Sequence, residues 1–510
     1  MRIGPALLLF CGLLQSLPVP EAAAQARGRI EPDVRRNERF PGGEPNPPAP
    51  ATNRVARPQP APSPKDRIAF TDARRRLGDA MPDGARVRLG LVEGGAGAYA
   101  PDPASGMLRG LNLVTASGDS DPSGHATMTA TLLAGRSGLV GEPVELRVWS
   151  VADWMGSGFL NAGTPDPPAW TPRSPQVFSH SWIGTDTGQA AQVLRRVDHV
   201  IDRHDVVMAV GVNNGRDTPV PTMLSSAHNV IAVGVASGNS SGGLTQIEGR
   251  GRVKPDIVAP TGTTSEATPL VAGAAALLIE RAEVLDAENP PSPGGLSYAD
   301  ARRAETIKAA LLASARKSPR WSNSPEQPLD AHLGAGVLDV DQALRVIEAG
   351  QTAPGGKMRR GRGHSFGALG PGEAHEFVLE PGGALKDLTF ALTWHRRVLG
   401  VVVSLEPKAA AADATVPLDE LERPVPRTGW VPVPVTTDFD LSFVRVADDG
   451  TTDLVDFSRS RVDNVELLRL RRLPAGTYRL VVSRGESPEG AAAPDLWDYA
   501  MAWTIGGPAG

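Results

Sequence analysis

The sequence predicts an α/β domain with a parallel sheet covered by helices on both faces, followed by an antiparallel β-sandwich or jelly roll. Between residues 66 and 350, short apolar runs alternate with helical segments, a pattern that favours a parallel sheet. After residue 350 the helical segments stop, and short alternating runs divided by turn residues follow, which is typical of a sandwich. The chain has 510 residues, enough for two or three domains with their own cores.

The first 26 residues have the pattern of an export signal. Arg2 supplies the positive start, residues 7–14 form the apolar segment, and residues 22–26 offer a small-residue cleavage site. The apolar segment is too short to span a bilayer, although a retained membrane anchor is the alternative. Cys11, the single cysteine, lies inside this signal, so we expect a mature protein without thiols or cysteine metal sites. We therefore expect a bacterial exported protein, secreted or periplasmic, with no stable membrane span after signal removal.

The remaining elements follow in order along the chain. Residues 27–65 include ten prolines and are expected to be a disordered linker. In the α/β domain, 66–350, a short helix is expected over 66–80, strands over 87–92, 144–151, 176–179, 206–212 and 230–235, and helices over 127–133, 188–202, 269–285 and 299–315. A basic, glycine-rich linker is expected over 351–363. In the sandwich, 364–510, strands are expected over 375–379, 388–394, 438–446, 465–470, 477–483 and 498–505.

The motif with the clearest chemistry is Thr-Ser-Glu-Ala-Thr-Pro at residues 264–269. It presents one serine hydroxyl, Ser265, just before a helix, and Pro269 is expected at the first helical position, where its missing N–H costs nothing. A serine there lies near the positive end of the helix dipole and beside free backbone N–H groups. This place suits a nucleophile whose product oxygen becomes negative. The alternative is a helix-capping cluster, so the role of Ser265 depends on partners elsewhere.

Two residues supply the partners that a serine nucleophile needs. His125 follows a glycine just before a helix of small residues, and an imidazole can take the serine proton. Glu93 ends an apolar strand and precedes two glycines, at a strand end where α/β proteins gather functional groups. Its carboxylate would orient the imidazole, with Asp121, four residues before His125, as the competing acid. The alternatives are a structural histidine and a solvent-exposed glutamate.

Asn213 is the candidate for stabilising the oxyanion. It follows the strand expected over 206–212 and precedes Asn-Gly. A side-chain amide there can donate to an oxyanion, an interaction worth about 3 kcal/mol in the transition state. The alternative is a turn asparagine, which Asn-Asn-Gly favours by itself.

Together these positions resemble the subtilisin-like serine peptidases, or subtilases. Residues 264–269 with the following Val-Ala-Gly-Ala-Ala-Ala match the family's nucleophile motif, and His125 matches the first histidine of its His-Gly-Thr-His-Val-Ala-Gly. Asn213 falls in its Gly-Asn-x-Gly, and residues 254–260, Lys-Pro-Asp-Ile-Val-Ala-Pro, match the segment that precedes the serine. The resemblance covers about residues 66–350. The region after residue 364 resembles, more loosely, the jelly-roll domains appended to secreted peptidases.

The resemblance implies a subtilisin-like fold and an exported serine endopeptidase. It implies Ser265 as nucleophile, His125 as base, Glu93 as acid and Asn213 as oxyanion donor. It further implies that the substrate is bound by Ser181, Trp182 and Val212. The expected substrate is a protein or peptide.

The sequence departs from the family pattern at two site positions. The family's acid is normally Asp, whereas Glu93 is longer by one methylene and must approach the imidazole through another rotamer or a shifted strand. Val212 replaces a glycine and is expected to narrow the pocket for the residue before the scissile bond. These departures motivate the alternative of a catalytically impaired protein that acts as a binding or scaffold module. A third reading, an esterase of the α/β-hydrolase type, would want Gly-x-Ser-x-Gly around the nucleophile, and this pattern does not surround Ser265.

The remaining expectations concern partners and cofactors. The net charge of −5 and the lack of a long basic run argue against nucleic acid as a partner. The expected chemistry requires no cofactor. Asp438 and Asp440 alternate along a strand and are candidates for a structural calcium site, with two solvated carboxylates as the alternative. The sequence leaves the oligomeric state open.

Overall fold

The computed structural model describes residues 62–95, 97–184, 188–290, 296–358, 361–405, 427–486 and 496–506. The expected export signal and nearly all of the expected 27–65 linker lie outside these ranges, and the expected domain boundaries stay predictions. Among the helices within these ranges, none combines the length and the apolar character that crossing a membrane requires.

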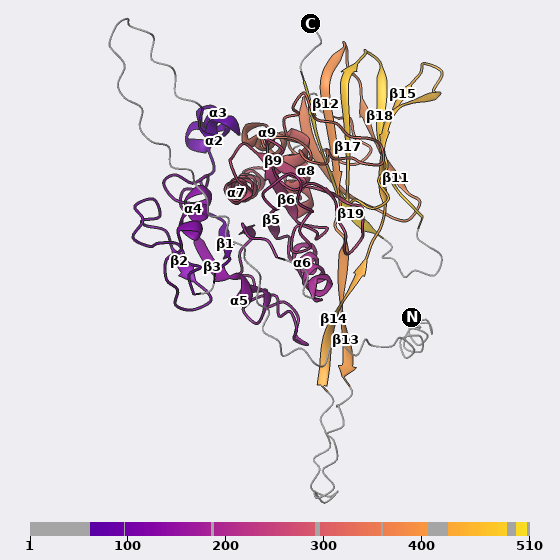
Figure 1. The fold of residues 1–510 in the computed structure, drawn as a ribbon. Helices are drawn as coiled ribbons and strands as arrows, with labels where there is room; N and C mark the ends of the chain where they lie inside the picture. Colours follow the sequence, from indigo (N-terminus) through magenta and orange to yellow (C-terminus); the bar gives the residue numbers. More distant parts are fainter. Residues whose placement is uncertain are drawn as a thin grey trace, which may run out of the picture. The chain divides into compact units, whose positions relative to one another are not determined.

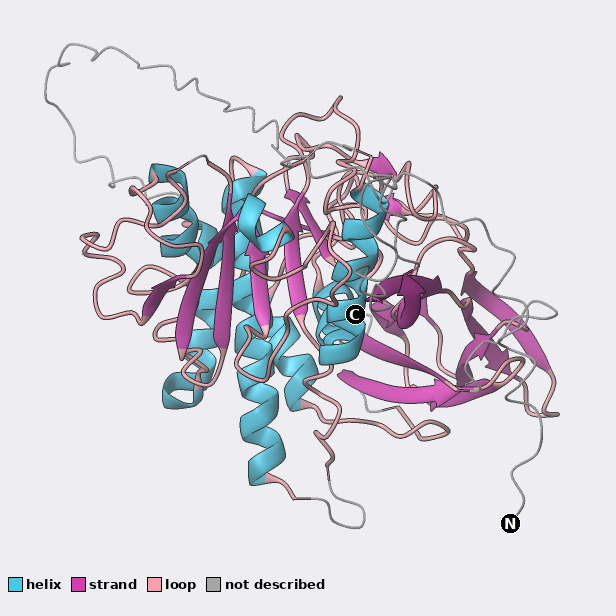
Figure 2. Cartoon of the chain, turned by 90° about the horizontal axis from the view of Figure 1, so that it is seen from below, coloured by secondary structure: helices cyan, strands magenta, loops and turns pink. Residues whose placement is uncertain are grey.

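The centre of the α/β domain is a seven-stranded sheet in which every neighbouring pair of strands is parallel (Figures 1 and 2). Its order is β2 (Leu113–Thr115), β3 (Glu145–Ser150), β1 (Arg88–Glu93), β4 (Val177–His180), β5 (Val207–Gly211), β6 (Ile231–Val235) and β9 (Ile257–Ala259). Strands β4, β5 and β6 are buried along their whole length, as expected when helices cover both faces of a parallel sheet. The predicted fold class is confirmed.

The strand order reverses beside β1, and this places the site. Strand β1 lies between β3 and β4, with Glu93 opposite Ser150 on one side and Val92 opposite His180 on the other. From β1 the chain adds strands first in one direction and then, from β4 onward, in the other. In open parallel sheets such a reversal leaves a crevice at the carboxyl ends of the strands, where ligands bind.

Nine helical segments accompany the sheet in the described ranges. They are α2 (Pro64–Arg67), α3 (Phe70–Leu77), the 3-10 helix η4 (Gly78–Ala80), α4 (Gly124–Leu133), α5 (Val151–Met155), α6 (Ala190–His204), α7 (Thr264–Glu288), α8 (Ala304–Ser314) and α9 (Val340–Glu348). Helix α7 packs against β4, β5, β6 and β9 and also against α4. Small residues permit the approach to β5: a Cβ added to Gly211 would lie 2.9 Å from Oγ1 of Thr268 on α7. A short antiparallel pair, β7 (Gly243–Leu244) and β8 (Val253–Lys254), completes the domain.

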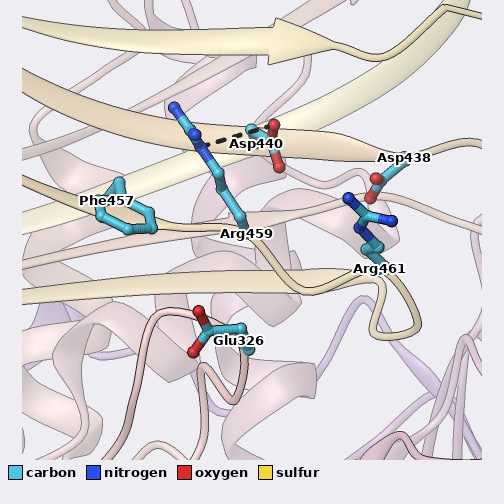
Figure 3. A pocket seen from close by; sticks show the side chains of 6 residues that line it. All are labelled: Glu326, Asp438, Asp440, Phe457, Arg459 and Arg461. Atoms are coloured by element: carbon cyan, nitrogen blue, oxygen red, sulfur yellow. Dashed lines mark ion pairs between the residues drawn. The ribbon is translucent and has the colours of Figure 1, made fainter.

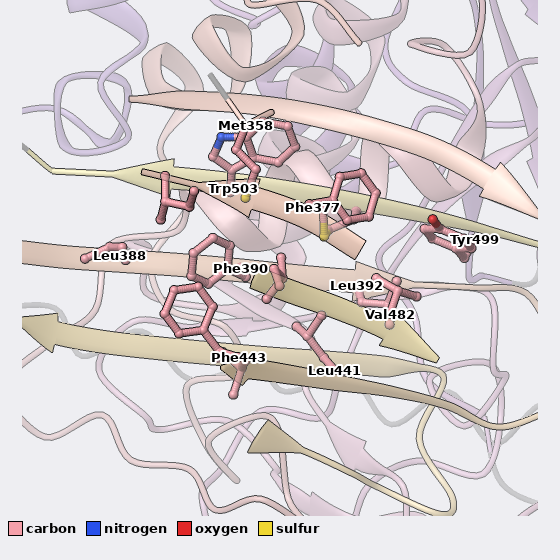
Figure 4. Packing of buried hydrophobic residues seen from close by; sticks show 14 of the residues in the cluster. Met358, Phe377, Leu388, Phe390, Leu392, Leu441, Phe443, Val482, Tyr499 and Trp503 are labelled. Atoms are coloured by element: carbon pink, nitrogen blue, oxygen red, sulfur yellow. The ribbon is translucent and has the colours of Figure 1, made fainter. Parts of the chain in front are cut away.

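The C-terminal part contains two four-stranded antiparallel sheets in a sandwich-like arrangement. One has the order β10 (Arg362–Leu369), β19 (Trp497–Ile505), β12 (Leu385–Thr393) and β17 (Val465–Leu473). The other has β11 (Ala374–Leu379), β18 (Thr477–Arg484), β15 (Phe439–Val446) and β16 (Thr452–Ser458). Aromatic and leucine side chains from both sheets form the core between them, with the rings of Phe390 and Phe443 stacked at 5.5 Å (Figure 4). Strands β13 (Arg397–Leu405) and β14 (Arg427–Val435) form a separate antiparallel pair.

Buried polar groups attach the sandwich to the α/β domain. Arg396, just before β13, donates from Nη2 to Asp198 Oδ2 on α6 at 2.5 Å and from Nη1 to Glu248 Oε2 at 2.7 Å. Its backbone N–H donates to Asn229 Oδ1 at 2.8 Å. Asp198 and Arg396 are at most 3 % exposed, so the charge of Arg396 is compensated by Asp198 and Glu248 and not by solvent.

Candidate functional site

The expected acid and base are in direct contact. Glu93 is the last residue of β1 and is fully buried, whereas His125 is the second residue of α4. Glu93 Oε2 lies 2.6 Å from His125 Nδ1, and the other carboxylate oxygen accepts a 2.6 Å hydrogen bond from Thr129 Oγ1. Both carboxylate oxygens are thus engaged, and the extra methylene of glutamate does not prevent the contact with the imidazole.

The imidazole of His125 is held at one nitrogen and open at the other side. Helix α4 begins at Gly124, with the side chain of Ser123 accepting from Ala126 N. This places His125 in the first turn, where its side chain keeps 42 % exposure. The hydrogen bond to Glu93 raises the pKa of His125, and partial burial opposes this rise. In the neutral form, an Nδ1–H donated to the carboxylate leaves the Nε2 lone pair free to accept a proton.

The competing acid, Asp121, lies elsewhere. Its side chain is exposed, and its backbone N–H donates to Gly97 O at 3.1 Å. Among the hydrogen bonds and ion pairs of the described residues, the carboxylate that reaches His125 is Glu93. The geometry therefore favours Glu93 over Asp121 as the orienting group.

Ser265 is the second residue of α7, the longest helix described. The helix begins with a capping box, in which Thr263 and Glu266 satisfy each other's backbone N–H groups. The N–H of Thr264 donates to Asn214 Oδ1 at 3.0 Å. For the N–H of Ser265, the hydrogen bonds of the described residues include no acceptor, so this donor of the first turn remains for a ligand.

The expected helix start at Pro269 is wrong. Helix α7 begins at Thr264, and Pro269 lies inside it as the sixth residue. The capping box starts the helix earlier, and proline lacks the N–H that would bond the carbonyl of Ser265 four residues before it. That carbonyl instead accepts a 3.2 Å hydrogen bond from Ser181 Oγ. Ser181 thus supplies the hydrogen bond to this carbonyl that Pro269 cannot make.

Asn213 and Val212 follow strand β5 directly. The backbone of Asn213 is fixed by Ser241, whose Oγ accepts from Asn213 N at 3.0 Å and whose N–H donates to Asn213 O at 2.8 Å. In the part of the chain that the structure describes, no hydrogen bond involves the half-buried side-chain amide of Asn213. Val212 is fully buried, and its N–H donates to Val233 O.

The two other expected substrate-binding residues follow strand β4. Ser181 is 7 % exposed, and its Oγ donates to the carbonyl of Ser265. Trp182 is 6 % exposed and donates from its indole N–H to His180 Nδ1 at 3.3 Å. A Cβ added to Gly184 would lie 3.1 Å from Met223 Cε and 3.2 Å from the Trp182 ring. The Trp182 side chain is therefore packed in the wall beside the nucleophile and offers little surface itself.

The hydroxyl of Ser265 does not point at the imidazole in this structure. Ser265 Oγ is 3.5 Å from Ser181 O, a long contact for a hydroxyl donor. The hydrogen bonds of the described residues include none between Ser265 and His125. Rotation about one serine side-chain torsion changes the direction of Oγ, and catalytic hydrogen bonds often tighten only when a substrate is bound.

The expected calcium candidates lie beside arginines. Asp438 and Asp440 line a pocket of about 560 Å³ together with Arg459 and Arg461 (Figure 3). Arg459 Nε is 3.8 Å from Asp440 Oδ2. Burial and the neighbouring Asp440 raise the pKa of Asp438 to about 6. Within the described ranges no three His, Cys, Asp or Glu side chains group as metal ligands would.

Sequence reasoning missed two residues that position the site. Thr129 holds the second oxygen of Glu93, and its spacing of four from His125, one helical turn, is the signal that could have found it. Asn214 holds the first N–H and the hydroxyl of Thr264. The neighbouring Asn213 was predicted as the functional residue because of its amide, but the local sequence pattern does not distinguish the roles of the two asparagines.

The fold and the site define a class: an α/β protein of the subtilisin type, with a serine, a histidine and a carboxylate at the carboxyl edge of its sheet. Residues 112–336 match the model of the subtilase family. Over this region the chain is therefore similar to the subtilases, a family of serine-type peptidases that act on proteins or peptides. The matched residues include His125, Asn213 and Ser265, whereas Glu93 precedes them.

Comparison with solved structures gives low similarity over the whole chain. Tripeptidyl peptidase 2 is 12 % identical with a TM-score of 0.29, covering 75 % of this chain and 40 % of its own. The Yersinia pseudotuberculosis-derived mitogen is 8 % identical with a TM-score of 0.16, covering 28 % of this chain and 84 % of its own. The g-type lysozyme inhibitor PliG of Aeromonas hydrophila is 7 % identical with a TM-score of 0.16, covering 30 % and 98 %. TM-scores of this size establish nothing about this chain. No curated protein sequence matches it.

Proposed function

We propose that this protein is an exported serine endopeptidase with a Ser265, His125 and Glu93 triad. The observation that carries the proposal is the 2.6 Å contact between His125 Nδ1 and the fully buried carboxylate of Glu93. A carboxylate in this position fixes the imidazole tautomer and stabilises the imidazolium that forms during catalysis. The match of residues 112–336 to the subtilase family model supports the same reaction.

The proposed reaction begins with attack of Ser265 Oγ on the scissile carbonyl carbon. His125 Nε2 takes the hydroxyl proton as the Oγ–C bond forms, and Glu93 stabilises the resulting imidazolium. His125 then gives the proton to the leaving amine as the C–N bond breaks. Water, deprotonated by the same imidazole, hydrolyses the acyl-enzyme and restores Ser265.

The oxyanion is held by two donors in this proposal. The N–H of Ser265 lies in the first turn of α7, where the helix dipole favours negative charge. The side-chain amide of Asn213 is the second donor, on a backbone fixed by Ser241. Loss of one such donor costs about 3–4 kcal/mol of transition-state stabilisation.

A second candidate function is a catalytically impaired subtilase domain that serves as a binding or scaffold module. The orientation of Ser265 Oγ toward Ser181 O, with no hydrogen bond to His125 among the described residues, favours it. The two candidates differ in whether Ser265 is nucleophilic. Reaction with a fluorophosphonate, which is attacked by activated serines, separates them.

The test is fluorophosphonate labelling of the full chain beside Ser265→Ala and Asp121→Asn, with mass spectrometry to locate the label. We expect labelling of the wild type and of Asp121→Asn at Ser265, and none of Ser265→Ala. Folded wild type that takes no label would overturn the peptidase proposal and favour the scaffold module.

Export and metal independence belong to the same proposal. Residues 1–26 supply the export pattern, so deletion of this segment should retain the protein in the cytoplasm in cell fractionation. The proposed steps use only side chains of this chain. We therefore expect a chelator to leave the rate of peptide hydrolysis unchanged, whereas a loss would point to a structural ion such as calcium.

A further inference from the structure

A second pocket lies where the segment after α8 meets the sandwich. Its volume is about 320 Å³. Lys317, Ser318 and Pro319 line it from the segment after α8, whereas Asp387 on β12 and Arg469 and Arg471 on β17 line it from the sandwich. These six residues complete its lining.

The charges of this pocket do not balance. Three cationic side chains, Lys317, Arg469 and Arg471, face one carboxylate. That carboxylate, Asp387, is 66 % exposed and lies 3.7 Å from Arg469 Nη2. The ion pairs of the described residues include none for Lys317 or Arg471. The pocket therefore carries excess positive charge that the protein itself does not neutralise.

The protonation of Lys317 is sensitive to this excess positive charge. Its Nζ donates to the carbonyl of Ala315 at 3.1 Å and lies 5.3 Å from the centre of the Trp321 ring. The guanidinium of Arg469 lies over the same ring at 5.6 Å. Burial, and then the charge of Arg469, lower the pKa of Lys317 to about 7. A bound anion would oppose both effects, because it would stabilise the protonated form of Lys317.

One of the residues that line this pocket carries a hydroxyl without a partner. Ser318 Oγ is buried without a hydrogen-bond partner, although a buried hydroxyl normally finds one. Together with the ammonium and the two guanidinium groups, it gives a set of donors. Guanidinium and ammonium groups with hydroxyl donors are the usual ligands of sulfate and phosphate oxygens.

We propose that this pocket binds a small tetrahedral oxyanion of the sulfate and phosphate class. Lys317 and Ser318 would bind it from the α/β domain, and Arg469 and Arg471 from the sandwich. The anion would thus link the two parts of the chain across their contact, which α8 makes with β12 and β19. The proposal does not depend on the peptidase activity.

The test is isothermal titration calorimetry of the full chain with sodium sulfate, at constant ionic strength set by sodium chloride. Arg471→Gln and Ser318→Ala remove donors, whereas Arg472→Gln changes an exposed arginine of the same strand that does not line the pocket. A charged hydrogen bond contributes about 1.5–3 kcal/mol, so we expect at least roughly tenfold weaker binding in Arg471→Gln. We expect binding within about twofold of wild type in Arg472→Gln, because a distant surface charge is screened.

The pH dependence provides a second readout. Sulfate does not titrate between pH 6 and 8.5, whereas Lys317 gains its proton as the pH falls through about 7. The charged groups that face it are Arg469, Arg471 and Asp387. Sulfate should bind more tightly at pH 6 than at pH 8.5 with proton uptake, and Lys317→Met should abolish that difference.

Three results would overturn the proposal. The first is no sulfate binding by the folded wild type. The second is equal affinity in Arg471→Gln and Arg472→Gln, which would indicate a general salt effect on stability. The third is acetate binding as tight as sulfate, which would exclude selection for a tetrahedral oxyanion. Phosphate binding comparable to that of sulfate would support it.

Discussion

Replacement of Glu93 by glutamine tests the proposed site most directly. Glutamine has the size of glutamate, so the fully buried position stays filled. Its amide oxygen can still accept from Thr129, which turns the amide NH2 toward His125 Nδ1. An NH2 group there can only donate, so the imidazole proton moves to Nε2. His125 then presents an N–H to Ser265 and cannot take its proton.

The size of the effect follows from the two losses. The charge-assisted hydrogen bond at 2.6 Å contributes about 1.5–3 kcal/mol, which equals roughly one to two decades of rate. The unfavourable tautomer adds the remainder, and the combined loss of kcat for this substitution is about ten-thousand-fold. Glu93→Asp keeps the charge but withdraws the carboxylate by about 1.5 Å, one carbon–carbon bond. We expect the kcat of Glu93→Asp to lie between those of Glu93→Gln and the wild type.

The assay is hydrolysis of a chromogenic peptide across a pH series, with thermal unfolding to establish that each variant is folded. The base must be neutral, so the rate rises as the pH passes the pKa of His125, which the Glu93 hydrogen bond raises above its ordinary 6.5. In Glu93→Gln this acid limb should move to lower pH. Near-normal activity of Glu93→Gln together with loss of activity in Asp121→Asn would refute the reasoning.

Three further predictions concern neighbouring features. Thr129→Val removes the donor to Glu93 and should lower kcat about tenfold in the same peptide assay, with a change below twofold counting against a positioning role. Val212→Gly should raise kcat/KM for substrates with a large residue before the scissile bond by about 10- to 200-fold relative to small ones, and an unchanged ratio contradicts it. Asp198→Asn removes one of the two carboxylates that pair with the buried Arg396 and leaves Glu248 as the other. Urea unfolding should show a destabilisation of about 1.5–3 kcal/mol, the contribution of a charged hydrogen bond, and a value within error of wild type would contradict it.

The sequence was sufficient for the parts of the fold that repeat a local pattern. Apolar runs followed by helical segments predicted β1, β3, β4, β5 and β6, because the strands of a covered parallel sheet are mostly apolar. It also predicted that Glu93 and His125 would serve one site. Their contact depends on parallel strands and a helix start meeting at one edge of the sheet, which the alternation of elements implies.

Elements fixed by tertiary contacts were missed. Strand β10 contains two glycines and few β-branched residues, so its local pattern does not favour a strand. Its state is set by pairing with β19, where a Cβ on Gly363 would collide with the ring of Trp503. The start of α7 was misplaced because Pro269 is usually a boundary signal, whereas here the lost hydrogen bond is replaced from 84 residues away. No local pattern carries that information.

The proline inside α7 also determines how the nucleophile is anchored. A regular helix would use the carbonyl of Ser265 for its own backbone, and the residue would then be held by the helix alone. Because Pro269 releases this carbonyl, Ser181 ties the nucleophile to the end of β4, a strand that borders the sheet's crevice. Any displacement of Ser265 along the helix axis must therefore disturb the wall of the crevice as well. The hydrogen bond that Pro269 removes from α7 is thus replaced by one that holds Ser265 at the end of β4.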